Sequence, residues 1–142
     1  MATSPESIVS NDQPRSDELS QRGQKLAQHG MDLLAGGDAS GAAGAFREAI
    51  AAAPEHIEAH HGLIRALCDG EQFESAVAAA HALTALTPND PLAQTSLSIA
   101  LQKAGQIPEA EAAAGRARIL EWKHQLAQPA TNSATEERAP FV

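Results

Sequence analysis

Residues 30–54 read GMDLLAGGDASGAAGAFREAIAAAP, and this stretch decides the fold of the chain. The pair Gly36-Gly37 separates two runs of helix-forming residues. Asp38, directly after the glycines, can accept a hydrogen bond at the start of the second run. Pro54 closes the stretch, because proline cannot continue a helix. These signals predict two helices joined by a tight turn.

The same organisation returns twice along the chain, each time after 34 residues. Gly70 and Gly105 mark the later turns. Asp90-Pro91 combines a side-chain acceptor with a residue that lacks an N–H, which favours a helix start. Equivalent residues align in three units: Gly30, Ala42, Phe46, Ala49 and Pro54; then Ile64, Ala76, Ala80, Leu83 and Pro88; then Ser98, Ala110, Ala114, Ala117 and Trp122.

A period of 34 residues with small side chains at these offsets resembles the tetratricopeptide repeat. The resemblance covers three full units, at about residues 23–56, 57–90 and 91–124. It implies an all-α fold, a right-handed α-solenoid of three helix-turn-helix repeats. Ala80 and Ala114 depart from the family pattern, which has a large aromatic residue such as Phe46 at this position. We expect closer or weaker helix packing there.

Composition agrees with helices and restricts the class of protein. Alanine occupies 31 of the 142 positions and aromatic residues only 3%, whereas strands favour β-branched and aromatic residues. The net charge of −8 repels phosphate backbones, so we expect no nucleic-acid partner. The single cysteine, the lack of a signal-peptide core and the lack of a long apolar run predict a cytoplasmic protein without direct membrane insertion.

The sequence predicts one domain, residues 17–128, between two tails. Residues 1–16 and 129–142 are polar, and they bury too little surface to offset the entropy cost of ordering. We therefore predict that both tails are disordered. Within the domain we expect helices near residues 17–35, 39–53, 55–69, 73–87, 91–104 and 107–127.

No motif for catalysis, cofactor binding or metal binding stands out. The chain lacks the nucleophile-elbow, phosphate-loop and zinc-protease signatures, and it has no pair of cysteines. His56 and His60 are four residues apart and could share one helix face, but a stable metal site needs a third ligand. Glu58 and His61 point elsewhere on that helix. We therefore predict that the protein is not an enzyme and holds neither a cofactor nor a stoichiometric metal ion.

The resemblance implies that the first helix of each repeat lines a concave groove. The side chains expected to face it are Ala27, Met31, Leu34, Glu58, His61, Arg65, Cys68, Leu92, Thr95, Ile99 and Gln102. Some family members clamp a C-terminal carboxylate here with Lys, Asn and Arg side chains, but the matching positions hold Ala27, Met31, Gly62, Leu92 and Ser96. A largely apolar groove fits an amphipathic helix or an extended apolar segment better. The alternative is that Met31, Leu34 and Ile99 are only core between repeats.

The predicted function is that of a non-enzymatic adaptor or scaffold that binds a helix or peptide of a partner protein in this groove. The alternative is a structural or assembly subunit that self-associates, or docks in a larger complex, through the solenoid ends. The last expected helix has no stop signal before Pro129 and would leave three apolar residues partly exposed as an end contact: Leu120, Trp122 and Leu126. The alternative is that Trp122 packs against its own repeat. The middle repeat is acidic and the last helix is locally basic. This uneven charge could drive head-to-tail association or orient a partner, and the alternative is that it is only solvated surface.

Overall fold

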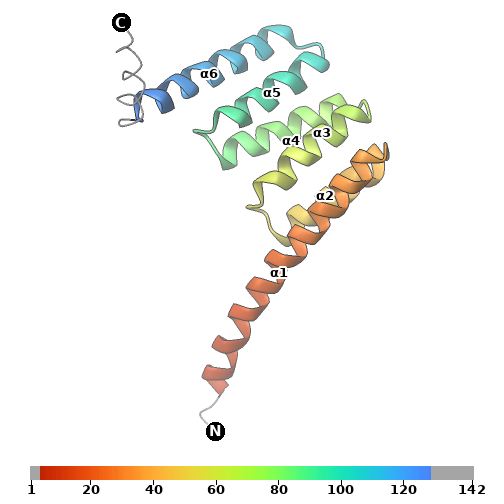
Figure 1. Cartoon of the computed structure of the whole chain (residues 1–142), viewed down its shortest axis with the longest axis vertical. Coiled ribbons are helices and arrows are strands. Elements are labelled where there is room, and N and C mark those ends of the chain that lie inside the picture. Colours follow the sequence, from red (N-terminus) through yellow and green to blue (C-terminus); the bar gives the residue numbers. More distant parts are fainter. Residues whose placement is uncertain (1–3, 129–142) are drawn as a thin grey trace, which may run out of the picture.

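The computed structural model of the chain describes residues 4–128, with side chains from Arg15 onward. Within that range it has six helices and no strand. The helices are α1 (Ser4–Ala35), α2 (Ala39–Ala52), α3 (Ile57–Asp69), α4 (Phe73–Leu86), α5 (Pro91–Lys103) and α6 (Ile107–Leu126). They follow one another as three hairpins in a single stack (Figure 1).

The first helix corrects one of the predicted boundaries. α1 begins at Ser4 and has 32 residues, so the helix starts before the predicted residue 17 and takes in most of the stretch 1–16, for which a disordered tail was predicted. α2 has only 14 residues, and the N-terminal part of α1 therefore extends beyond the stack (Figure 1). The sequence of residues 4–16 has no periodic apolar pattern, which explains why this part of the helix was not predicted. The tail predicted at 129–142 lies outside the described residues.

The other five helices begin and end within two residues of the predicted bounds. Two predicted helix starts are confirmed in detail. The Asp38 carboxylate accepts a hydrogen bond from the Gly41 N–H at 2.9 Å, and the Asp90 carboxylate accepts one from the Leu92 N–H at 3.0 Å. Each bond satisfies a first-turn N–H that has no partner inside its helix.

The turn between the two helices of a repeat has the same backbone geometry three times. Gly37, Glu71 and Gly105 occupy equivalent positions, and their φ angles are 90°, 60° and 84°. In the first turn the Asp38 N–H donates to the Leu33 carbonyl at 2.9 Å, and equivalent bonds close the other two turns. This is the Schellman arrangement, which satisfies the last carbonyls of a helix. The 34-residue period is therefore a property of the backbone as well as of the sequence.

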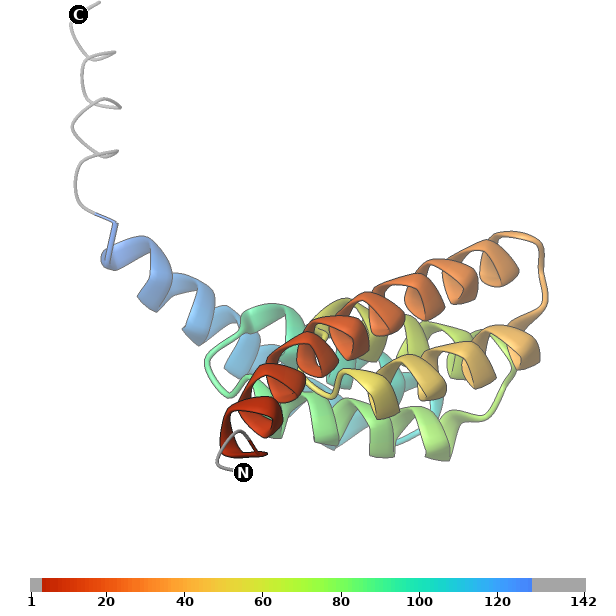
Figure 2. The ribbon, with the colours of Figure 1, turned by 90° about the horizontal axis from the view of Figure 1, so that it is seen from below.

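The helices form two layers with unequal spacing. The backbone of α1 contacts that of α3, and α3 contacts α5, whereas α2, α4 and α6 make no backbone contact with one another. The odd-numbered helices therefore lie closer together, and the stack curves so that they line its inner side. At one end of the stack the C-terminal part of α6 projects away from the other helices (Figure 2).

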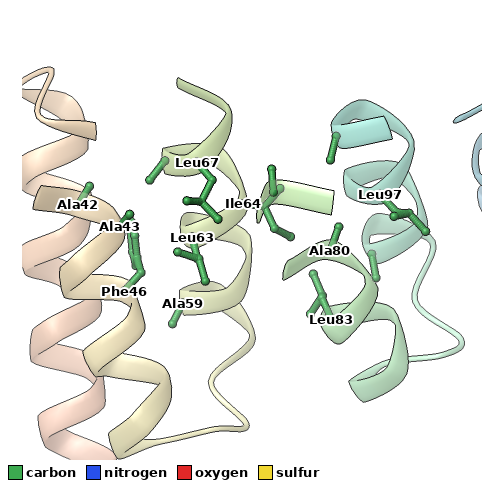
Figure 3. Close-up of a cluster of buried hydrophobic side chains, with 14 of the residues drawn as sticks. Ala42, Ala43, Phe46, Ala59, Leu63, Ile64, Leu67, Ala80, Leu83 and Leu97 are labelled. Carbon is green, nitrogen blue, oxygen red and sulfur yellow. The ribbon is translucent and has the colours of Figure 1, made fainter. Parts of the chain in front are cut away.

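Alanine and a few large side chains fill the space between neighbouring helices (Figure 3). Phe46 on α2 is fully buried and lies against Gly30 of α1 and Gly62 of α3. A Cβ atom added at Gly30 would lie 2.9 Å from the Phe46 ring, and one at Gly62 would lie closer still. The two glycines thus leave the space that the ring occupies.

In the later repeats the positions equivalent to Gly30 and Phe46 hold side chains of different sizes. In the second repeat the buried pair is Ile64 and Ala80, so the larger residue is on the first helix of the repeat. In the third repeat the pair is Ser98 and Ala114, and both are small. The Ser98 hydroxyl donates a hydrogen bond of 2.8 Å to the Ala110 carbonyl. A polar contact therefore joins α5 to α6 where the first repeat uses an aromatic ring.

Candidate binding groove

A groove of about 820 Å³ lies between α1 and α3 on the inner side of the stack. We call it the α1–α3 groove. It is lined by twelve residues: Gln24, Ala27, Gln28, Met31, Leu34, Phe46, His56, Ile57, Glu58, His61, Gly62 and Arg65.

The floor of the groove is apolar. Ala27, Met31 and Leu34 follow one another on α1 at spacings of four and three residues, so they share one helix face, and Phe46 closes the floor from α2. Met31 is 48% exposed, and its flexible thioether chain can adapt to an irregular apolar partner. Leu34 is half-buried and also packs against the core, so it contributes to both the fold and the groove.

One edge of the groove is polar and comes from a single face of α3. Glu58, His61 and Arg65 follow at spacings of three and four residues. Burial lowers the pKa of His61, and the negative charge of Asp90 opposes this effect. His61 Nδ1 lies 3.0 Å from Ser96 Oγ on α5. The edge thus presents one carboxylate, one guanidinium and, at neutral pH, an uncharged imidazole between them.

Residues 33–99 match the model of the tetratricopeptide repeat family. The match, the three hairpins and the three equivalent turns agree. The chain is a tetratricopeptide-repeat protein. No curated protein matches the sequence significantly.

Solved structures have the same fold. MamA is similar with a TM-score of 0.68 and 19% identity, over 75% of this chain and 62% of the MamA chain, so this chain spans less than two thirds of that protein. The first TPR domain of Spaghetti (RPAP3), bound to the HSP90 peptide SRMEEVD, gives 0.67 and 19% over 87% and 96% of the two chains. The TPR2AB domain of yeast Sti1, in a pHSP90 complex, gives 0.69 and 17% over 95% and 50%. The predicted three-repeat solenoid is confirmed.

Six of the eleven side chains predicted to face the groove of this tetratricopeptide-repeat chain line the α1–α3 groove: Ala27, Met31, Leu34, Glu58, His61 and Arg65. Cys68 is half-buried and packs against the core. Burial raises the pKa of the Cys68 thiol, which makes it a weak nucleophile at neutral pH. Whether these residues bind a partner stays a prediction.

The other four predicted residues lie on α5 outside the groove: Leu92, Thr95, Ile99 and Gln102. All four are exposed, with 64% of Leu92 and 45% of Ile99 accessible. They occupy the positions that Gln24, Ala27, Met31 and Leu34 hold two repeats earlier. They therefore face the inner side of the stack, but they do not line the α1–α3 groove.

Sequence reasoning named Gly62 only as a groove position without a clamp residue, and it did not predict that five further residues line the groove: Gln24, Gln28, Phe46, His56 and Ile57. The period carried a signal for two of them, because Gln24 and Gln28 are one repeat before Glu58 and Gly62. Phe46 was interpreted only as core. Its position under the groove depends on the two glycines beside it, and this contact joins three helices.

The histidines at the start of α3 have separate roles. The buried His60 Nε2 donates a hydrogen bond of 2.8 Å to the Pro54 carbonyl, which ties α3 to the loop before it. His56 precedes α3 and lines the groove. Among the described residues no group of three or more His, Cys, Asp or Glu side chains is arranged to hold a metal ion.

The residues of the predicted end contact are exposed to different degrees. Leu120 is half-buried, whereas Trp122 and Leu126 are 61% and 67% exposed. In the part of the chain that the structure describes, no helix combines the length and the apolar character needed to cross a membrane.

Proposed function

We propose that this protein is a non-enzymatic adaptor or scaffold that binds a helix or peptide of a partner protein in the α1–α3 groove. The observation that carries the proposal is the exposed Met31 on an apolar floor, next to a polar edge formed by Glu58, His61 and Arg65. An apolar floor would supply the affinity, and the polar edge would set the register of the bound segment.

Two structural neighbours support peptide binding as the general activity, since their structures contain pHSP90 or an HSP90 peptide. The charge of the α1–α3 groove does not favour such an acidic peptide. Arg65 is the only lysine or arginine among its twelve residues, and a peptide such as SRMEEVD carries several carboxylates. We therefore propose a segment with mainly apolar contact residues, and not an acidic C-terminal tail.

The test is affinity capture from native lysate with matched baits. Met31→Glu places a charge on the groove floor. Leu86→Glu makes the same change on α4, where Leu86 is also an exposed apolar side chain, 39% accessible, and does not line the groove. We expect the wild type and Leu86→Glu to retain the same partner and Met31→Glu to lose it. Circular dichroism of the three baits confirms that they are folded.

A retained partner is then mapped to a segment, and its synthetic peptide is titrated against the three proteins. We expect a loss of affinity of about tenfold or more for Met31→Glu, because a buried charge without a partner would oppose binding. Equal capture by all three baits, or equal peptide affinity, would reject the groove as the binding site.

A further inference from the structure

The outward surface of α6 carries apolar side chains that are separate from the α1–α3 groove. Ile119, Trp122 and Leu126 are 52%, 61% and 67% exposed. Their spacing of three and four residues places them on one helix face, which we call the α6 stripe. The opposite face packs on α5 through buried alanines: Ala110, Ala113 and Ala117.

The lack of a fourth repeat does not explain this exposure. In the first repeat Phe46 is the α2 side chain that packs on the following helix pair, and its equivalent in α6 is Ala114. The residues equivalent to Ile119 are Ala51 and Ala85, and both are exposed. A further repeat would therefore cover Ala114, whereas Ile119 lies on the side that faces solvent in the earlier repeats. Trp122 aligns with Pro54 and Pro88, which are exposed as well.

Basic side chains border the α6 stripe on both sides. On the helix surface Arg118 lies next to Trp122, and Lys123 lies beside Ile119 and Leu126 on the other side. Both cations are exposed, and neither has a hydrogen bond or ion pair within the described residues. Since the chain as a whole carries −8, this basic border is a local exception on an acidic protein.

We propose that the α6 stripe is a docking site for an acidic amphipathic helix of a partner protein. The occupant has to cover apolar side chains over about 10 Å of helix and to place carboxylates against Arg118 and Lys123. An acidic amphipathic helix does both, and the remaining acidic surface would repel it from other positions. A second copy docking through the same stripe would bring like charges together. This site is independent of the function proposed for the groove.

An anionic bilayer would also attract these two cations. The net charge of −8 opposes its approach, and a helix with a buried second face can insert only a narrow strip. The net charge of the protein and the narrow exposed strip of α6 therefore favour an acidic helix over a lipid surface as the occupant of the α6 stripe.

Trp122 is the only tryptophan of the chain, so its fluorescence reports directly on the stripe. The probe is a synthetic helical peptide with leucine at spacings of three and four and glutamate elsewhere, without tryptophan. The matched control has lysine in place of glutamate. We expect the glutamate peptide to shift Trp122 emission to the blue in a saturable manner that weakens with added salt. The lysine peptide should leave the emission unchanged.

Four variants of the full chain locate the contact. The double variant Arg118→Glu/Lys123→Glu should lose about tenfold or more in affinity for the glutamate peptide. Arg47→Glu, on the exposed surface of α2, should not change it. Met31→Glu should leave it unchanged as well, which separates this site from the groove. Phe141→Ser should not alter Trp122 emission in the absence of peptide.

Each opposite result overturns the proposal. If both peptides shift the emission equally, or if the double variant binds the glutamate peptide as tightly as the wild type, an acidic helix is ruled out as the occupant of the α6 stripe. A blue shift with phosphatidylserine vesicles but not with the glutamate peptide assigns the stripe to lipid. A shift that grows with protein concentration alone assigns it to a second copy. A red shift in Phe141→Ser assigns it to the C-terminal residues of the chain itself.

Discussion

The first and the last repeat share the same turn but are held together by different contacts. In the first, Phe46 of α2 occupies the space left by Gly30 and Gly62 and joins three helices. In the third, the equivalent side chains are small, and a hydrogen bond from Ser98 to the Ala110 carbonyl joins α5 to α6. The comparison shows that the same backbone repeat forms with a large side chain between its helices or with only small ones. It also places the fully buried Phe46 directly beneath the candidate groove.

The largest effect is expected at Phe46, if this side chain is the main support of the first repeat. Phe46→Ala leaves a cavity where three helices meet, and we expect it to lower the free energy of unfolding by about 3–5 kcal/mol. Urea unfolding followed by circular dichroism measures this change. Ile99→Ala, at an exposed position of α5, serves as control and should cost far less. Similar losses in the two variants would contradict the special role of Phe46.

Gly62→Ala tests the same contact, because the account predicts that this change lowers the free energy of unfolding. Alanine usually stabilises a helix relative to glycine by about 1 kcal/mol, but a Cβ at Gly62 would overlap the Phe46 ring. We expect Gly62→Ala to destabilise by about 1–3 kcal/mol. Gly44→Ala is the matched control, because a Cβ at Gly44 has no neighbour within 4 Å, and it should stabilise. A stabilising Gly62→Ala would show that the ring is not held closely.

Ser98→Ala tests the contact between α5 and α6 in the last repeat. Ser98→Ala removes the hydrogen bond to the Ala110 carbonyl, and we expect a loss of about 0.5–1.5 kcal/mol in the free energy of unfolding. Ser75→Ala, at an exposed position of α4, should cause no comparable loss. If Ser98→Ala is neutral, apolar packing alone holds α6 to α5, and the two repeats differ less than the structure indicates.

The smallest effect concerns pH and the contact between the second and third repeats. Burial lowers the pKa of His61 from its ordinary value of 6.5. Between the lowered and the ordinary value, the unfolded chain binds a proton that the folded chain does not, so stability decreases as the pH falls through this interval. Above the interval His61 has no effect on the pH dependence. Urea unfolding at several pH values should show a weaker loss toward acid for His61→Gln than for the wild type, and identical slopes would contradict this cause.

The sequence predicted the repeat architecture because its strongest signals are local. Asp38 and Asp90 act as helix caps as expected, and the glycine turns mark the boundaries between helices. The extension of α1 to Ser4 was missed, because the sequence of residues 4–16 shows no apolar periodicity. Local patterns also gave no reason to expect the hydrogen bond between Ser98 and the Ala110 carbonyl.

The groove was predictable in part. The period gave the facing side of each first helix, which identified Met31, Glu58 and Arg65. It could not show that a hollow lies between α1 and α3, because its depth depends on contacts between residues far apart in sequence. Gly62 illustrates this limit: the sequence marked it only as a position without a clamp residue, whereas in the structure it makes room for Phe46.

The most direct test of the proposed function is site-specific photo-cross-linking in the native lysate. A photoreactive amino acid replaces Met31 in the groove in one protein and Leu86 on α4 in another, since both positions are exposed and apolar. The account predicts a discrete covalent adduct with a partner polypeptide at position 31 and none at position 86. An adduct at position 86 with none at position 31 would contradict it.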